Sequence, residues 1–263
     1  MPGSANVAIR ACNVDLHLQR AGAGEPLVFS PDAHLGAAWL PFHDRLAEHF
    51  EVILFEHPGY GGGDPPPWLE RVTDLANFYL DTLTQLDLAR VHLVGTALGG
   101  WIAAELATRN TSRLASLTLI DPWGLRVDGA AGIDLFARTD EQAVYDLSFD
   151  RKKAEPLVAR LLAPEGEDAL LKGKMMTAKL AWQPRLFDPQ LGKWLHRIDV
   201  PTLIVWGRED RLLPAAYGAA WQAAIPGAQL VAVANAGHWP HVEQPAETAN
   251  IVHDFIAQQR AAT

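Results

Sequence analysis

Residues Val91–Leu106 read VHLVGTALGGWIAAEL, and this stretch decides the fold. It begins with a short apolar run typical of a buried strand and continues with apolar residues at helical spacing. Between the two parts, Gly95, Gly99 and Gly100 surround a very tight turn. A strand and a helix that meet at such a turn approach too closely to leave room for side chains. The stretch therefore predicts a strand–turn–helix unit.

The middle of this turn departs from a familiar pattern. The spacing matches the nucleophile elbow G-x-S-x-G, which holds its central residue in a strained backbone conformation above a sheet. Here the central residue is Ala97, which has no hydroxyl group. A phosphate loop is the alternative for a glycine-rich turn, but the lysine that it needs is missing. We therefore expect a site at Ala97 that lacks its usual nucleophile.

Length and composition narrow the class of protein. A chain of 263 residues, 49% of them hydrophobic, can bury the core of one large domain. The net charge of −9 argues against nucleic acid or an anionic membrane as a partner. A single cysteine, Cys12, excludes an internal disulfide framework. With no signal-peptide pattern at the N-terminus, we expect a cytoplasmic protein that acts on a small molecule without a cofactor. No motif predicts its oligomeric state.

Strands alternate with helices along most of the chain, which predicts an α/β fold with a doubly wound, mostly parallel sheet. Residues 124–195 interrupt this alternation with helical stretches and no clear strand. We expect a core formed by residues 1–123 and 196–263, with residues 124–195 inserted as a helical lid. Ordinary connecting helices that cover no site are the alternative.

Two polar residues follow predicted strands near the C-terminus. Asp210 stands in the sequence GRED, and His238 stands in GHWP. The carboxyl ends of parallel strands meet at one edge of a sheet, so both should lie near Ala97. There a histidine can accept a proton, while a carboxylate fixes its tautomer. Asp121 is an alternative acid, although a turn cap before Pro122 is the simpler interpretation.

Four motifs occur in a fixed order: HPGYG at residues 57–61, the elbow, GREDRLLP at 207–214 and NAGHWPHVEQP at 235–245. With this set the chain resembles the α/β-hydrolase superfamily over nearly its whole length. The resemblance implies the α/β-hydrolase fold. It also implies that Ala97 occupies the nucleophile position, Asp210 the acid position and His238 the base position.

The loop after Phe29 also departs from the family pattern, which has His-Gly there. This chain has Ser30-Pro31-Asp32-Ala33. Proline has no N–H group, and a carboxylate is unfavourable beside a developing oxyanion. The donors of an oxyanion hole would then be the backbone N–H of Leu98 and one from this loop, for which we choose Ala33. The side chain of Asp32 should cap the following turn in a hydrolase, or point inward as an acid–base or ligand-binding group in another enzyme.

Three hypotheses for function follow. The first is hydrolysis of ester or C–C bonds by a serine hydrolase in which Ala97 replaces the serine by design. The second is a naturally serine-less enzyme that uses His238 as acid or base for elimination, lyase or cofactor-free chemistry. The third is a ligand-binding protein without catalysis. A metal site formed by Asp32, His34 and His57 is a weaker idea, and we predict no metal.

The substrate is expected to be small and apolar or aromatic, because tryptophans are abundant near the predicted site. The candidate contacts are loop or lid residues: Asp32, His34, Trp39, Trp123, Trp182 and Trp239.

Overall fold

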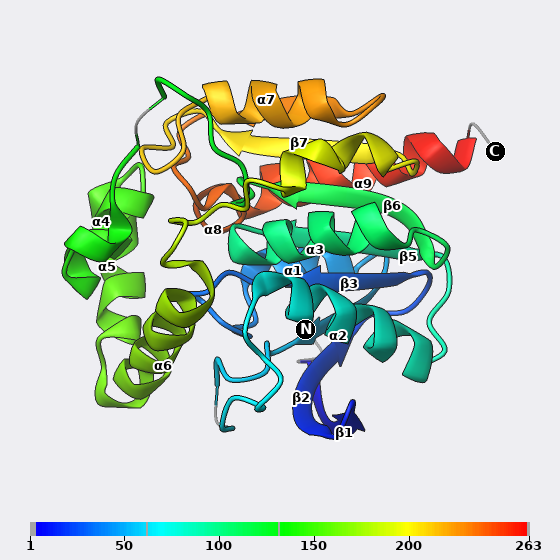
Figure 1. Cartoon of the computed structure of the whole chain (residues 1–263), viewed down its shortest axis with the longest axis horizontal. Coiled ribbons are helices and arrows are strands. Elements are labelled where there is room, and N and C mark those ends of the chain that lie inside the picture. Colours follow the sequence, from blue (N-terminus) through cyan, green and yellow to red (C-terminus); the bar gives the residue numbers. More distant parts are fainter. Residues whose placement is uncertain (1–3, 62, 131, 262–263) are drawn as a thin grey trace.

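The computed structural model describes residues 4–61, 63–130 and 132–261. Within these residues eight strands form one sheet in the order β1-β2-β4-β3-β5-β6-β7-β8 (Figure 1). β1 and β2 form an antiparallel hairpin, β2 is antiparallel to β4, and the pairs from β4 to β8 are parallel. The strands are β1 (Ala5–Ala11), β2 (Val14–Ala21), β3 (Pro26–Ser30), β4 (Glu51–Phe55), β5 (Val91–Thr96), β6 (Leu114–Ile120), β7 (Thr202–Gly207) and β8 (Gln229–Val233).

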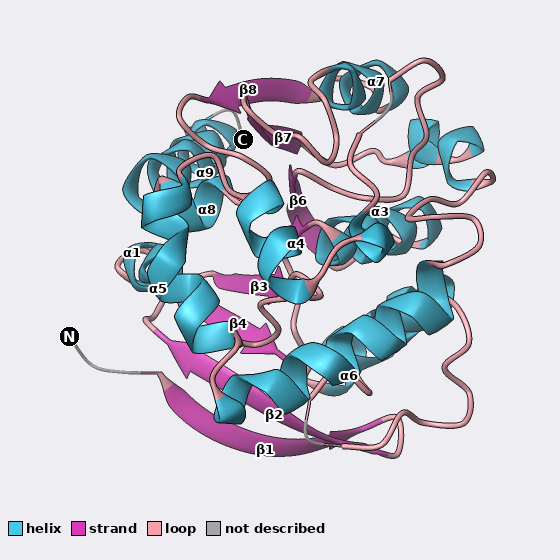
Figure 2. Ribbon diagram, turned by 90° about the vertical axis from the view of Figure 1, so that its left-hand side faces the viewer, coloured by secondary structure: helices cyan, strands magenta, loops and turns pink. Residues whose placement is uncertain are grey.

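Helices cover both faces of the sheet. α1 and α9 contact each other on one face, while α3 and α7 lie on the other, with α2 packed against α3 (Figure 2). This is the doubly wound arrangement that the alternating sequence predicts. These helices are α1 (Pro41–Ala47), α2 (Val72–Gln85), α3 (Leu98–Arg109), α7 (Ala216–Ala224), α8 (Pro240–Glu243) and α9 (Pro245–Ala261).

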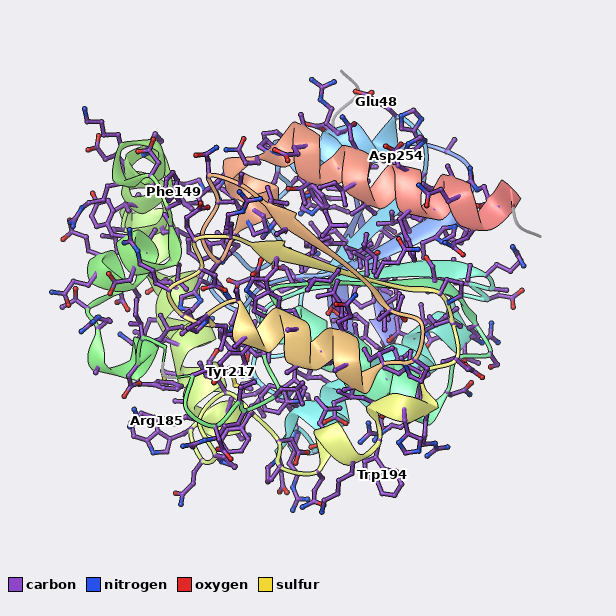
Figure 3. All side chains as sticks on the ribbon, turned by 90° about the horizontal axis from the view of Figure 1, so that it is seen from above. Glu48, Phe149, Arg185, Trp194, Tyr217 and Asp254 are labelled. Atoms are coloured by element: carbon purple, nitrogen blue, oxygen red, sulfur yellow. The ribbon has the colours of Figure 1, made fainter. Side chains whose placement is uncertain are left out.

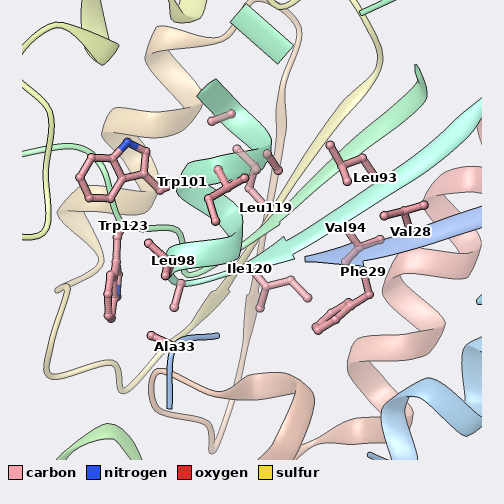
Figure 4. Packing of buried hydrophobic residues seen from close by; sticks show 14 of the residues in the cluster. Val28, Phe29, Ala33, Leu93, Val94, Leu98, Trp101, Leu119, Ile120 and Trp123 are labelled. Carbon is pink, nitrogen blue, oxygen red and sulfur yellow. The ribbon is translucent and has the colours of Figure 1, made fainter. Parts of the chain in front are cut away.

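The central strands are buried on both faces, as parallel strands between two helical layers must be. Every residue of β5 and of β7 is buried. Figure 4 shows how Phe29, Val94 and Ile120 pack where β3, β5 and β6 lie next to one another. The buried core therefore extends to the point where the elbow leaves the sheet.

Residues 124–195 form helices at the carboxyl ends of the strands. Figure 1 shows the helices between residues 140 and 181 beyond the arrowheads of β6 and β7, whereas residues 195–197 pack against α3. Two contacts fix this placement: the N–H of His238 donates to the carbonyl of Leu147 at 2.7 Å, and Tyr60 Oη lies 3.4 Å from Thr177 Oγ1. The segment contains η1 (Leu135–Ala137), α4 (Asp140–Leu147), α5 (Arg151–Leu161), α6 (Pro164–Ala181) and η2 (Leu191–Lys193), and η3 (Leu195–Arg197) follows.

None of the helices in the described part of the chain has both the length and the apolar character needed to cross a membrane.

The elbow depends on contacts between backbones that only glycine permits. A Cβ atom at Gly99 would overlap the carbonyl oxygen of Ser30 and lie 2.6 Å from that of Pro31. A Cβ at Gly95 would in turn overlap the backbone of Gly99. Because these neighbours are backbone atoms, they cannot rotate away, and strand β3, strand β5 and helix α3 are held together without side chains between them.

We predict that Gly99→Ala destabilises the protein by more than about 4 kcal/mol or prevents folding, since the clash is with backbone in the core. Urea unfolding measures the difference. Gly63→Ala is the control, because a Cβ there has no atom within 4 Å. Equal stability of the two variants would contradict this account of the turn.

Candidate active site

The register of the parallel strands brings five loops together. Ser30 of β3 pairs with Gly95 of β5, and Thr96 of β5 pairs with Ile120 of β6. Next to β6 lies β7, followed by β8. The loops that leave these strands carry Asp32, Ala97, Asp121, Asp210 and His238, in that order across the sheet.

Ala97 occupies the turn in a strained conformation. Its φ of 48° and ψ of −112° lie outside the regions favoured by residues with a side chain. Such a conformation costs about 1–3 kcal/mol, which the surrounding backbone contacts must offset. The residue is fully buried, and Leu98 begins helix α3 immediately after it. The N–H of Leu98 therefore belongs to the first helical turn, where intrahelical acceptors are lacking.

His238 and Asp210 form a buried pair. His238 Nδ1 lies 2.7 Å from Asp210 Oδ2, and both side chains are inaccessible to solvent. The other oxygen of Asp210 accepts from the N–H groups of Leu212 and Leu213 at 2.8 and 3.1 Å. These bonds hold the carboxylate rigidly against the imidazole. The hydrogen bond predicted between His238 and Asp210 is thus confirmed.

Asp121 lies behind this pair as a second carboxyl group. The N–H of Gly207 donates to its two oxygens at 3.0 and 3.1 Å, and its carboxyl group is hydrogen-bonded to Asp210. Complete burial and the neighbouring charge of Asp210 raise the pKa of Asp121 well above its usual range. These effects favour the protonated form of Asp121, which supports Asp210 rather than replacing it beside His238.

The residues of this buried cluster are also possible metal ligands. Among the described residues, Asp121, Asp210 and His238 offer ligand atoms within 4.8 Å of one another. The hydrogen bonds just described account for this proximity without a metal ion. Of the three residues considered from the sequence as a metal site, Asp32, His34 and His57, none belongs to this cluster.

The second ring nitrogen of His238 also has a partner. The indole N–H of Trp123 donates to His238 Nε2 at 3.0 Å, and the two rings are nearly parallel, with centroids 6.3 Å apart. Both side chains are almost completely buried. With Nδ1 facing a carboxylate and Nε2 accepting a proton donor, His238 is the neutral tautomer that carries its proton on Nδ1.

Asp32 combines both orientations considered from the sequence. Its Oδ1 accepts from the N–H groups of His34 and Leu35 at 2.6 and 3.1 Å, which caps the turn. The side chain is nevertheless buried, and Oδ2 has no hydrogen-bond partner within the described residues. Burial opposes ionisation, but the His34 side chain at 3.5 Å and the backbone N–H of His34 lower the pKa of Asp32 to about 2. Asp32 is therefore a buried anion at neutral pH.

Buried histidines surround this region in the neutral form. His57 Nε2 lies 2.9 Å from the carbonyl of Pro31, and its Nδ1 lies 3.0 Å from Tyr79 Oη. Because burial disfavours the charged form, the pKa of His57 falls to about 4 and that of His241 also to about 4. Sequence inspection singled out His57 only as a weak metal ligand, yet it braces the loop that carries Asp32.

A small cavity lies next to Trp123, between the loop that carries Ala33 and helices of residues 124–195. Its volume is about 30 Å³. Three of its lining residues, Ala33, His34 and Trp123, are candidates from the sequence, while Ala97 and His238 do not reach it. The remaining wall comes from residues 124–195: Leu135, Phe136, Asp140, Ala143, Leu170, Gly173, Lys174, Thr177 and Leu186.

Three of the candidate tryptophans lie elsewhere. Trp39 donates to Asp44 at 2.8 Å, and Trp239 is fully buried with its ring 6.1 Å from that of His34. Trp182 is 47% exposed, and Arg185 lies over its ring. Arg185 projects from the outer side of the segment (Figure 3). None of these tryptophans lines the cavity, because proximity to a loop does not determine which way a side chain points.

Comparison with known proteins agrees with this geometry. Residues 33–245 match the model of the α/β-hydrolase fold family. The chain belongs to this family. It is 28% identical to a 2-hydroxy-6-oxononadienedioate/2-hydroxy-6-oxononatrienedioate hydrolase from Cupriavidus pinatubonensis, over 92% of this chain and 90% of the relative.

Solved structures show the same fold. A bacterial membrane phospholipase A superposes with a TM-score of 0.84 at 24% identity, covering 98% of this chain and 87% of the other. The 2-hydroxy-6-oxo-6-phenylhexa-2,4-dienoate hydrolase of Rhodococcus sp. strain RHA1 superposes with a TM-score of 0.79 at 18% identity, covering 97% and 99%. At these identities the likeness establishes architecture.

The ionised state of Asp32 makes a prediction about acid stability. Its pKa falls from 3.8 to about 2 on folding, so it stabilises the fold by about 2 kcal/mol above pH 5, and this contribution is lost as the pH falls towards 2. Asp32→Asn should therefore be less stable than the parent at pH 7, with the difference shrinking between pH 5 and 3. Urea unfolding across this range measures it. A difference independent of pH would show that the charge is not what stabilises the loop.

Proposed function

We propose that this protein is a hydrolase that cleaves ester or C–C bonds next to a carbonyl group in a small apolar or aromatic substrate. The observation that carries the proposal is the buried His238–Asp210 pair beside an elbow that retains its strained geometry around Ala97. A methyl group cannot attack a carbonyl carbon. Water is then the nucleophile that His238 can activate.

The reaction follows from the positions of the groups. His238 Nε2, once its bond to Trp123 opens, takes a proton from water while the water oxygen attacks the carbonyl carbon. Asp210 stabilises the imidazolium through Nδ1. The N–H of Leu98, with that of Ala33, is the proposed donor set for the oxyanion. When the tetrahedral intermediate collapses, the C–O or C–C bond breaks, and the imidazolium returns its proton to the leaving group.

The proposed substrate class rests on the relatives and on the cavity. The first relative described above is by name a hydrolase of oxo-dienedioates and trienedioates, and the second solved structure is by name a hydrolase of a phenyl-substituted dienoate. The cavity wall contributed by residues 124–195 is largely apolar, with Asp140, Lys174 and Thr177 as polar groups. We therefore propose that these helices act as a lid that excludes water around an unsaturated or aromatic ketone or ester.

A second candidate function uses the same histidine for proton transfer without hydrolysis, as in an elimination or lyase reaction. The observation that favours it is the buried anion of Asp32, which is unusual beside an oxyanion site. The two candidates differ in the fate of water. In water enriched with oxygen-18, hydrolysis of a ketone or ester panel places one labelled oxygen in the acid product, whereas elimination places none.

Introducing a hydroxyl group at residue 97 tests the proposed site. We predict that Ala97→Ser hydrolyses p-nitrophenyl acetate about 100-fold or more faster than the parent, with a burst that corresponds to an acyl-enzyme detectable by mass spectrometry. The matched control is the double variant Ala97→Ser/His238→Gln, which should lose the gain. If the folded Ala97→Ser variant hydrolyses no ester of a broad panel faster than the parent does, this result would count against a hydrolase site at the elbow.

A further inference from the structure

The hydrogen bond from Trp123 to His238 occupies the one atom that the proposed reaction needs. In a histidine base that carries its proton on Nδ1, the lone pair on Nε2 must accept the proton of the attacking group. Here that lone pair accepts the indole N–H of Trp123 at 3.0 Å. With Ala97 unable to donate, the indole takes the place of the missing hydroxyl as the donor to Nε2.

Trp123 is held in this position by the elbow itself. Its backbone N–H donates to the carbonyl of Ala97 at 3.0 Å. The residue after it, Gly124, has a φ of 108°, and a Cβ there would lie 2.7 Å from the ring of Trp101. The backbone around Trp123 is thus fixed, and a change in its contact with His238 must come from the side chain.

Trp123 also separates His238 from the cavity. The indole is part of the cavity wall, as are His34 and Ala33, while His238 does not contribute to it. A cavity of about 30 Å³ holds little more than a water molecule. Sites for small organic ligands are about tenfold larger or more. A substrate that enters this cavity therefore reaches His238 when the wall that contains Trp123 moves.

We propose that Trp123 is a positioning residue that couples substrate entry to release of the base. The indole holds His238 in the neutral tautomer and covers Nε2, and an entering substrate displaces the indole, which enlarges the cavity and frees the lone pair in one movement. The displaced N–H group then faces the enlarged cavity as a hydrogen-bond donor for a carbonyl oxygen. This inference rests on the proposed function in that it takes His238 as the base.

The test measures how fast a chemical reagent modifies the imidazole of His238, and it does not depend on catalytic turnover. Diethyl pyrocarbonate modifies unprotonated imidazole nitrogen, and the rate at His238 is read from the mass of its peptide. Trp123→Phe should raise this rate at least tenfold. The control is Trp206→Phe, which removes another buried indole N–H, one that donates to the carbonyl of Leu213 at 3.1 Å, and it should leave the rate unchanged. Equal rates in the parent and Trp123→Phe would overturn the proposal.

A second substitution separates loss of the N–H group from loss of size. Replacing Trp123 with β-(3-benzothienyl)alanine keeps the shape of the ring system and removes only the donor. The rate at His238 should again rise at least tenfold, and an unchanged rate would mean that the indole acts by bulk alone, contrary to the proposal.

Nuclear magnetic resonance of the parent protein covers the case in which these variants do not fold. With indole-¹⁵N tryptophan, the signal of Trp123 should shift in His238→Leu and on saturation with acetophenone, a neutral aromatic ketone. If no tryptophan signal responds to both changes, the proposal is wrong. Neither readout uses hydrolysis, so the two proposals can fail independently. Failure to find an ester or ketone substrate would contradict the proposed function without changing the results for Trp123.

Discussion

The site depends on the direct contact between the backbone of helix α3 and the end of strand β3. Gly99 touches the carbonyl groups of Ser30 and Pro31 with no side chain between them. This contact places the loop that carries Asp32 beside the turn at Ala97, and it fixes the start of the helix where Leu98 presents its N–H. Packing at the elbow, rather than any polar group, thus determines which loops can contribute to chemistry.

Once the loops are assembled, burial determines their charges. Burial and the neighbouring Asp210 raise the pKa of Asp121 and favour its protonated form, while Asp32 stays ionised because His34 and backbone N–H groups stabilise its carboxylate. The buried histidine of the neighbouring loop, His57, is neutral. The same interior thus favours the protonated form of one carboxyl group, Asp121, and the ionised form of another, Asp32.

Much of this arrangement could be predicted from the sequence, because it follows from backbone rules. Glycine spacing indicates the elbow, and strand order in a parallel sheet brings Asp210 and His238 to its edge. These rules do not specify side-chain direction. Trp39, Trp123 and Trp182 all lie near predicted loops, but only the fold shows that Trp123 turns towards His238 while Trp182 remains partly exposed.

The orientation and burial of the Asp32 side chain could not be predicted from the sequence for a related reason. From the sequence, capping the turn and pointing inward are alternatives, since a side chain that caps a surface turn normally faces water. In the fold the capped turn is itself buried, so one oxygen of Asp32 caps the turn while the whole carboxylate is inside the protein. Burial of this turn depends on segments far away in the sequence, such as the one that carries His57, whose ring lies 2.9 Å from the carbonyl of Pro31.

The strained turn at Ala97 has a structural role even though residue 97 carries no hydroxyl group. Its backbone costs about 1–3 kcal/mol whether or not the side chain reacts. The carbonyl of Ala97 accepts the N–H groups of both Trp101 and Trp123, so the same turn that presents Ala97 also anchors the residue that covers His238. In this protein the elbow therefore supports the backbone of Trp123, whose indole is hydrogen-bonded to His238, even though residue 97 contributes only a methyl group.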